Sequence, residues 1–195
     1  MLVLTVDQRG SRRHGDLVPE LLDALADAAE VRTVLGAERT VGDEVQLVVV
    51  DAAAAVEAVG LTARLGGWTV GIGVGEVRLP LPRSTRAARG GAFVAAREAV
   101  ERAKRQPARL AVAGGADPYA AQRAETALWL VLAVEGRRTE RGWQVVDAVR
   151  AAGNQAGAAA RLGVSAQAVS QVLRAAGWTE AERGRELATW LLEQL

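Results

Sequence analysis

The stretch RTVGDEVQLVVV, residues 39–50, places two adjacent carboxylates, Asp43 and Glu44, between a glycine and an apolar run. The glycine–aspartate pair is typical of a tight turn, and the apolar run at 45–50 predicts a buried strand. Residues 32–39 can form the strand that precedes the turn. The stretch therefore predicts a β-hairpin with both acids at its tip.

The surrounding sequence predicts an alternation of strands and helices. The expected elements are a strand at 2–6 that stops at Asp7, helices at 16–30 and 52–65, a glycine-rich strand at 69–77, an arginine-rich helix at 85–105 broken near its glycine pair, and a strand at 109–113. This β-α-β-β-α-β order with additions predicts an α+β fold. We expect a ferredoxin-like domain over 1–116, an antiparallel sheet covered by helices on one face, and an all-α domain over 117–195 with a helix-turn-helix at about 154–176.

Composition excludes several classes of protein. The 195 residues contain no cysteine and one histidine, which excludes disulfide scaffolds and sites built from cysteine or several histidines. With 24 basic and 23 acidic residues, total charge indicates no partner. The first residues lack the pattern of a signal peptide, and no apolar run reaches transmembrane length, so we expect a soluble cytoplasmic protein without a membrane partner.

The strongest local pattern lies in NQAGAAARLGVSAQAVSQVLRAAG, residues 154–177. Asn154 and Ser165 can each cap a helix, and Gly163 stands where a turn needs positive φ. Ala159 is small where two helices cross, and Val169 points back to a core. These offsets are typical of a DNA-binding helix-turn-helix.

The residues left on the outside of this unit suit nucleic-acid contacts, because amides, hydroxyls and arginine bind base edges and phosphates. No acid lies between 154 and 174 to repel phosphates. We expect double-stranded DNA to contact Asn154, Gln155, Ser165, Gln167, Ser170, Gln171 and Arg174. The alternative is a helical hairpin that only packs.

The last segment, residues 178–195, has Thr179 and Glu182 at capping-box spacing. Its apolar stripe, which includes Leu191 and Leu192, either packs on its own domain or forms the seam of a homodimer. We expect a homodimer, because paired DNA half-sites favour two-fold symmetry.

The two acidic loops are expected to meet. The first and third strands of a ferredoxin-like sheet are neighbours, so Asp7 would lie near Asp43 and Glu44. Carboxylates that converge repel each other unless a cation neutralises them, and Mg²⁺ accepts such ligands. The alternative is ordinary turn chemistry, with surface ion pairs to Arg9, Arg12 or Arg13.

This arrangement resembles the palm of class III nucleotidyl cyclases and GGDEF diguanylate cyclases. VGDEV at 41–45 is similar to the GGDEF signature, and FVAAR at 93–97 keeps an arginine of the cyclases. The resemblance implies that Asp7, Asp43 and Glu44 hold Mg²⁺. It also implies nucleotide contacts at Arg9, Arg12, Gly73, Gly75 and Arg97.

The whole chain is more similar to the SatD family, in its actinobacterial form with a C-terminal helix-turn-helix. The motifs that carry this resemblance are TVDQRGSR, GDEVQ, GIGVG, AFVAAREAVERAK and AARLGVSAQAVSQ. We therefore expect a DNA-binding transcriptional regulator whose cyclase-like domain senses a nucleotide or mediates dimerisation. A Mg²⁺-dependent nucleotidyl cyclase or nucleotidyltransferase, and a non-catalytic adaptor, stay open as alternatives.

Overall fold

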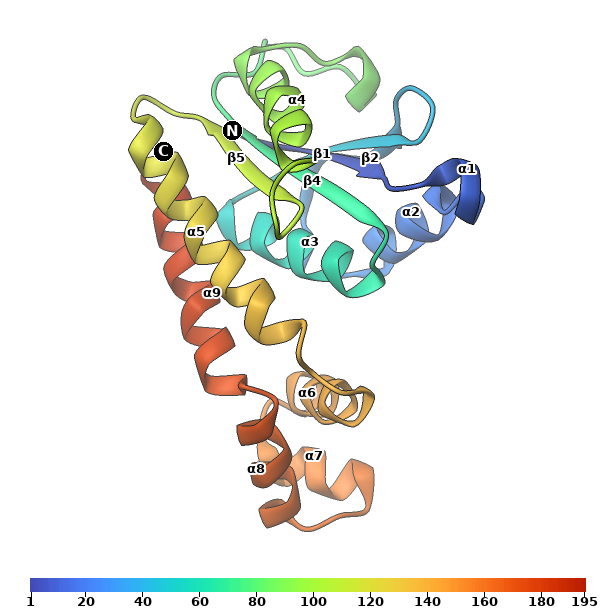
Figure 1. The fold of residues 1–195 in the computed structure, drawn as a ribbon, viewed down its shortest axis with the longest axis vertical. Coiled ribbons are helices and arrows are strands. Elements are labelled where there is room, and N and C mark those ends of the chain that lie inside the picture. Colours follow the sequence, from blue (N-terminus) through green and yellow to red (C-terminus); the bar gives the residue numbers. More distant parts are fainter.

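The computed structural model describes the backbone of all 195 residues and every side chain except those of Arg12 and His14. The fold is α+β, as expected, and its centre is a mixed five-stranded sheet in the order β2-β3-β1-β4-β5 (Figure 1). The strands are β1 (Leu2–Gln8), β2 (Thr33–Arg39), β3 (Glu44–Val49), β4 (Trp68–Val74) and β5 (Leu110–Gly114).

Helices alternate with the strands and then continue alone to the end of the chain. Those between strands are α1 (Ser11–His14), α2 (Val18–Asp27), α3 (Ala52–Leu65), the 3₁₀ turn η1 (Thr85–Ala87) and α4 (Gly91–Ala103). Those after the sheet are α5 (Pro118–Glu135), α6 (Glu140–Ala152), α7 (Gln155–Leu162), α8 (Ala166–Ala175) and α9 (Trp178–Glu193). No helix in the described part of the chain is long and apolar enough to cross a membrane.

The predicted hairpin is confirmed, because β2 pairs antiparallel with β3. β1 lies antiparallel to both β3 and β4. The expectation of a wholly antiparallel sheet is wrong for its last strand, since β5 runs parallel to β4. A parallel neighbour needs a crossover connection, and α4 supplies it.

Helices cover both faces of the sheet, which corrects the expectation of one covered face. Leu4 and Val6 of β1 pack in a core with α2 and α3. Val3 faces the opposite way and packs with Ala92 and Phe93 of α4. Successive side chains of a strand point to opposite faces, so an apolar run without alternation buries both sides.

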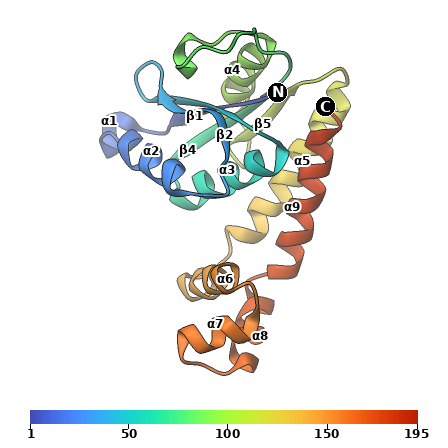
Figure 2. The same cartoon turned by 180° about the vertical axis from the view of Figure 1, so that it is seen from behind.

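The apolar core of the sheet continues into α5 and α9. Ala124 and Leu128 of α5 belong to the same cluster as the sheet, together with Ala188 and Leu192 of α9. The two helices run side by side past β5, as both views show (Figures 1 and 2). The apolar stripe of the last segment therefore packs against its own chain.

Helices α6, α7 and α8 form a separate cluster beyond the sheet. Its core contains Val145 and Val149 of α6, Ala159 of α7, and Val169 and Leu173 of α8. Figure 2 shows this unit projecting from the far ends of α5 and α9. The expected capping box at the start of α9 is absent: Gly177 in a left-handed conformation precedes the helix, and no side chain caps it.

Candidate functional sites

The three acidic residues predicted for this site lie together at one end of the sheet. Asp7 of β1 lies opposite Glu44 of β3 in the strand register, and the Gln8 N–H donates to the Asp43 carbonyl at 3.3 Å. Asp7 lies inside β1 and not at its end, so it has a fixed direction. It shares the parity of Val3 and therefore faces α4.

Helix α4 places cations over these carboxylates. Lys104, just after the helix, has its Nζ atom 3.3 Å from Asp7 Oδ2 and 2.7 Å from Glu101 Oε1. Two turns earlier, Arg97 Nη2 lies 2.9 Å from Glu44 Oε1. Arg97, predicted to contact a nucleotide, is thus paired with a carboxylate predicted to hold a metal.

Burial and neighbouring charges shift the protonation of this corner. Burial is the main reason why the pKa of Asp7 is raised; Lys104 opposes the shift and Asp43 adds to it. Burial alone lowers the pKa of Lys104, but hydrogen bonding to Glu101 and the charge of Asp7 hold it above its ordinary value. The corner is therefore a closely coupled group of charges.

Two of the predicted magnesium ligands are already paired with cations in this structure. Among the described residues, no group of three or more acidic, histidine or cysteine side chains could hold a metal ion. Lys104 and Arg97 already neutralise the two inward-facing carboxylates. Beneath them, the buried Gln46 amide donates to Thr5 at 3.1 Å, whereas the buried hydroxyl of Thr69, opposite Asp7, has no hydrogen-bond partner among the described side chains.

The glycines of β4 serve helix packing. A Cβ atom on Gly73 would lie 2.1 Å from the Ala92 carbonyl oxygen, and one on Gly71 would lie 2.2 Å from the Val100 nitrogen. The close approach expected at this strand is therefore made by the backbone of α4, which leaves no room for a ligand at Gly73. Gly75 lies at the start of the same helix, where a Cβ atom would lie 3.1 Å from the Ala92 nitrogen.

Two arginines of the first loop, Arg9 and Arg12, are predicted to contact a nucleotide. Arg9 is exposed, and its backbone N–H donates to the Gly67 carbonyl at 2.7 Å. It is one of the residues that line a cavity on the other face of the sheet from α4. The side chain of Arg12 lies outside the described residues.

The α7–α8 pair has the local geometry that its sequence predicts. The Gly157 N–H donates to Asn154 Oδ1 at 2.7 Å, and the Ala168 N–H donates to Ser165 Oγ at 3.1 Å, so both caps form. Gly163 has φ +65° in the turn between the helices. Ala159 and Val169 are buried at the contact between them.

The residues predicted to contact DNA lie on the outside of this pair. All are exposed except Ser170, which is half-buried; the set is Asn154, Gln155, Ser165, Gln167, Ser170, Gln171 and Arg174. The side-chain oxygens of Asn154 and Ser165 cap the starts of α7 and α8, so these two residues have a structural role in the pair. Gln167, Gln171 and Arg174 follow the i, i+4, i+7 spacing and form one stripe on α8.

Sequence reasoning missed a buried charge cluster where α3, α5 and α9 meet the α6–α8 unit. Arg185 of α9 and Glu135 of α5 form its centre, and Arg138 lies beside them. It also missed the cavity beside this cluster, to which three of the five tryptophans contribute. The only signal was the presence of charged and aromatic residues on otherwise apolar helix faces.

Comparisons with protein-family models, with curated proteins and with solved structures found no match to this chain. The resemblance to the SatD family therefore rests on the motifs alone.

Proposed function

We propose that the protein is a DNA-binding regulator in which α7 and α8 form a helix-turn-helix and α8 enters the major groove. The observation that carries this proposal is the outer stripe of α8, formed by Gln167, Gln171 and Arg174. Glutamine pairs with adenine and arginine with guanine in that groove. Residues 154–177 contain two arginines and no acid, so phosphates meet no repulsion there.

The position of the unit supports the same proposal. Helices α6–α8 have their own core and project beyond the sheet, so a duplex can reach α8 without meeting the sheet (Figure 2). The turn is held by the left-handed conformation of Gly163 and by the Ser165 cap at the start of α8. A hairpin that only packs would not need amide and guanidinium groups along one exposed stripe.

The test begins with selection of bound sequences from a random pool of double-stranded DNA. Fluorescence anisotropy then compares the wild-type protein with Gln167→Ala, Gln171→Ala and Arg174→Ala on the enriched site. We expect each variant to bind at least about fivefold more weakly, since a paired contact to a base contributes about 1–3 kcal/mol. Gln144→Ala on α6 and Arg183→Ala on α9, both exposed outside the stripe, are the controls. Equal binding by all variants contradicts the proposal.

We further propose that the body is a ferredoxin-like palm that supports dimerisation. The first four strands have the antiparallel order β2-β3-β1-β4, which is that of the ferredoxin-like sheet, and β5 is an addition to it.

On the outer side of the α5/α9 pair, Leu130, Leu187 and Trp190 are 65%, 51% and 55% exposed. A second copy of the chain would cover this face, and the dimer would then present two copies of α8 to DNA. Light scattering should give a dimer for the wild-type protein and a monomer for Leu187→Glu; a wild-type monomer contradicts this pairing.

A second candidate is nucleotide binding with Mg²⁺ at the acidic corner. It is favoured by the in-register pair Asp7 and Glu44 and by the unpartnered hydroxyl of Thr69. Lys104 would first have to leave Asp7. Thermal unfolding with ATP or GTP and MgCl₂ tests this candidate: stabilisation of the wild-type protein but not of Asp7→Asn is expected, and no stabilisation by either nucleotide contradicts it.

A further inference from the structure

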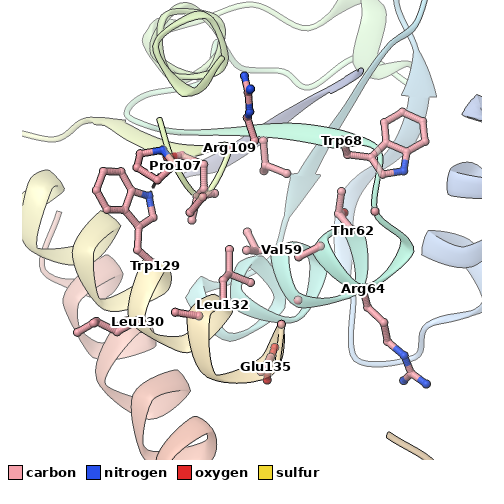
Figure 3. Close-up of a pocket in the computed structure, with 18 of the residues that line it drawn as sticks. Val59, Thr62, Arg64, Trp68, Pro107, Arg109, Trp129, Leu130, Leu132 and Glu135 are labelled. Atoms are coloured by element: carbon pink, nitrogen blue, oxygen red, sulfur yellow. Dashed lines mark hydrogen bonds between the residues drawn. The ribbon is translucent and has the colours of Figure 1, made fainter. Parts of the chain in front are cut away.

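We propose that a cavity between α3, α5 and the start of β4 binds a small carboxylic acid with a flat apolar body. The cavity has a volume of about 730 Å³, which is in the range of small-molecule sites. Figure 3 shows Trp129 of α5 and Trp68 of β4 at its two sides, with Val59 and Leu132 between them. Indole faces of this kind stack well on aromatic rings.

Three polar side chains of the cavity wall already have hydrogen-bond partners. The Trp129 Nε1–H donates to the Leu110 carbonyl at 2.9 Å, and the Thr62 hydroxyl donates to the Ala58 carbonyl at 2.7 Å. The Glu135 carboxylate accepts two hydrogen bonds from Arg185. These three groups offer little to a ligand, so the wall favours an apolar part inside, because a polar group buried there without a partner would lose its hydrogen bonds to water.

The mouth of the cavity favours an anion. Arg9 lines it and is exposed, and no carboxylate among the described side chains forms an ion pair with it. The other two arginines of the lining turn their guanidinium groups away from the centre (Figure 3). Arg64 pairs with Asp147 and Arg109 donates to the Lys104 carbonyl. Arg9 is thus the cation available to a carboxylate at the opening.

The binding test is isothermal titration calorimetry with two probes of the same shape, 2-naphthoate and 2-naphthalenemethanol. We expect 2-naphthoate to bind the wild-type protein more tightly. Arg9→Gln should weaken binding of the acid about tenfold and leave the alcohol unchanged, because a charged hydrogen bond is lost. Arg13→Gln, an exposed neighbour outside the cavity, is the control. Equal affinity for acid and alcohol overturns the role of Arg9.

A second pair of variants tests the cavity itself. Ala63 of α3 and Ala133 of α5 line it and are exposed, so a larger side chain can be added without crowding the core. Ala63→Phe with Ala133→Phe should abolish binding of both probes. Ala53→Phe, on the exposed face of α3 away from the cavity, should bind as the wild type does. Absence of binding by the wild-type protein at millimolar probe, or unchanged binding by the filled variant, overturns the site.

The cavity also touches the DNA-binding unit, and this part of the inference rests on the proposed function. Trp143 of α6 completes the wall, and the Arg64 guanidinium stacks 4.4 Å from its ring centroid. A ligand against Trp143 would bias the position of α6–α8. We expect saturating 2-naphthoate to change DNA affinity at least about fivefold in wild type but not in the filled variant. An unchanged affinity for DNA contradicts the coupling between cavity and DNA-binding unit. Calorimetry without DNA tests binding of the probe to the cavity independently.

Discussion

Arg185 of α9 donates two hydrogen bonds to Glu135 of α5, from Nε at 2.8 Å and from Nη2 at 3.0 Å, and both side chains are buried. Gly60 of α3 provides the space, because a Cβ atom there would lie 2.3 Å from the Arg185 guanidinium. Arg138 Nη1 lies 3.4 Å from the same carboxylate, and Arg138 Nε donates to the Ala176 carbonyl. Through Arg138, the charge cluster therefore links α5 and α9 to the residues just before α6 and just after α8.

Removing the acid from this pair should be costly. Glu135→Ala removes the carboxylate that binds two buried guanidinium groups and leaves Arg185 only its ion pair with Glu57 at 3.0 Å, so we expect the free energy of unfolding to fall by about 3–5 kcal/mol. Urea unfolding followed by circular dichroism measures the change. Glu193→Ala, exposed on α9, should stay within about 0.5 kcal/mol of the wild type. A decrease in the free energy of unfolding below about 1 kcal/mol for Glu135→Ala would show that the fold does not depend on this cluster.

The contact between β4 and α4 predicts opposite results for two strand glycines. Gly73→Ala places a Cβ atom against the backbone of α4, and overpacking of this kind costs about 1–3 kcal/mol or more. Gly36→Ala in β2 meets no atom within 4 Å, and we expect it to be neutral or slightly stabilising. Thermal unfolding of the two variants compares them. Equal stability would contradict the close approach of α4.

The acidic corner predicts a pH dependence of stability. A raised pKa means that folded Asp7 holds its proton more tightly than the unfolded chain does, so ionised Asp7 lowers the free energy of unfolding above its folded pKa. Asp7→Asn should therefore stabilise the protein at pH 7, and the gain should disappear below the ordinary value of 3.8. Denaturant unfolding at about pH 3.5 and pH 7 measures it.

Asp16 is the matched control, because its pKa is shifted the opposite way. A hydrogen bond from Arg39, with a second from the Val18 N–H, lowers the pKa of Asp16. Asp16 therefore contributes stability above its unfolded pKa and loses it as pH falls through its folded pKa. Asp16→Asn should destabilise the protein at pH 7 and have less effect in acid. The same pH profile for both variants would contradict this assignment.

The separate core of α6–α8 predicts local opening. Leu173→Ala removes a buried side chain from this core and should cost about 2–5 kcal/mol there. Hydrogen exchange should become faster in α6, α7 and α8 while β1 and β4 keep their protection. Leu47→Ala, in the sheet core, should destabilise the sheet strands instead. Faster exchange throughout the chain after Leu173→Ala would show that the two cores unfold together.

Local patterns predicted much of the secondary structure. The turn at Gly42 and Asp43 leads into β3 as expected, and the helix expected at 52–65 has those bounds. Asn154, Gly163 and Ser165 occupy their predicted capping and turn positions. These features depend on dihedral preferences and on hydrogen bonds between near neighbours, which a single stretch of sequence contains.

The partners of side chains depended on the tertiary structure. The continuous apolar run at 45–50 is consistent with burial of both faces, but it does not indicate which helices cover each face. The proximity of Asp7 and Glu44 follows from the predicted strand order, but the cations placed over them by α4 do not. Pairing, burial and cavities arise where distant segments meet, because their energies depend on distances in space that no local pattern contains.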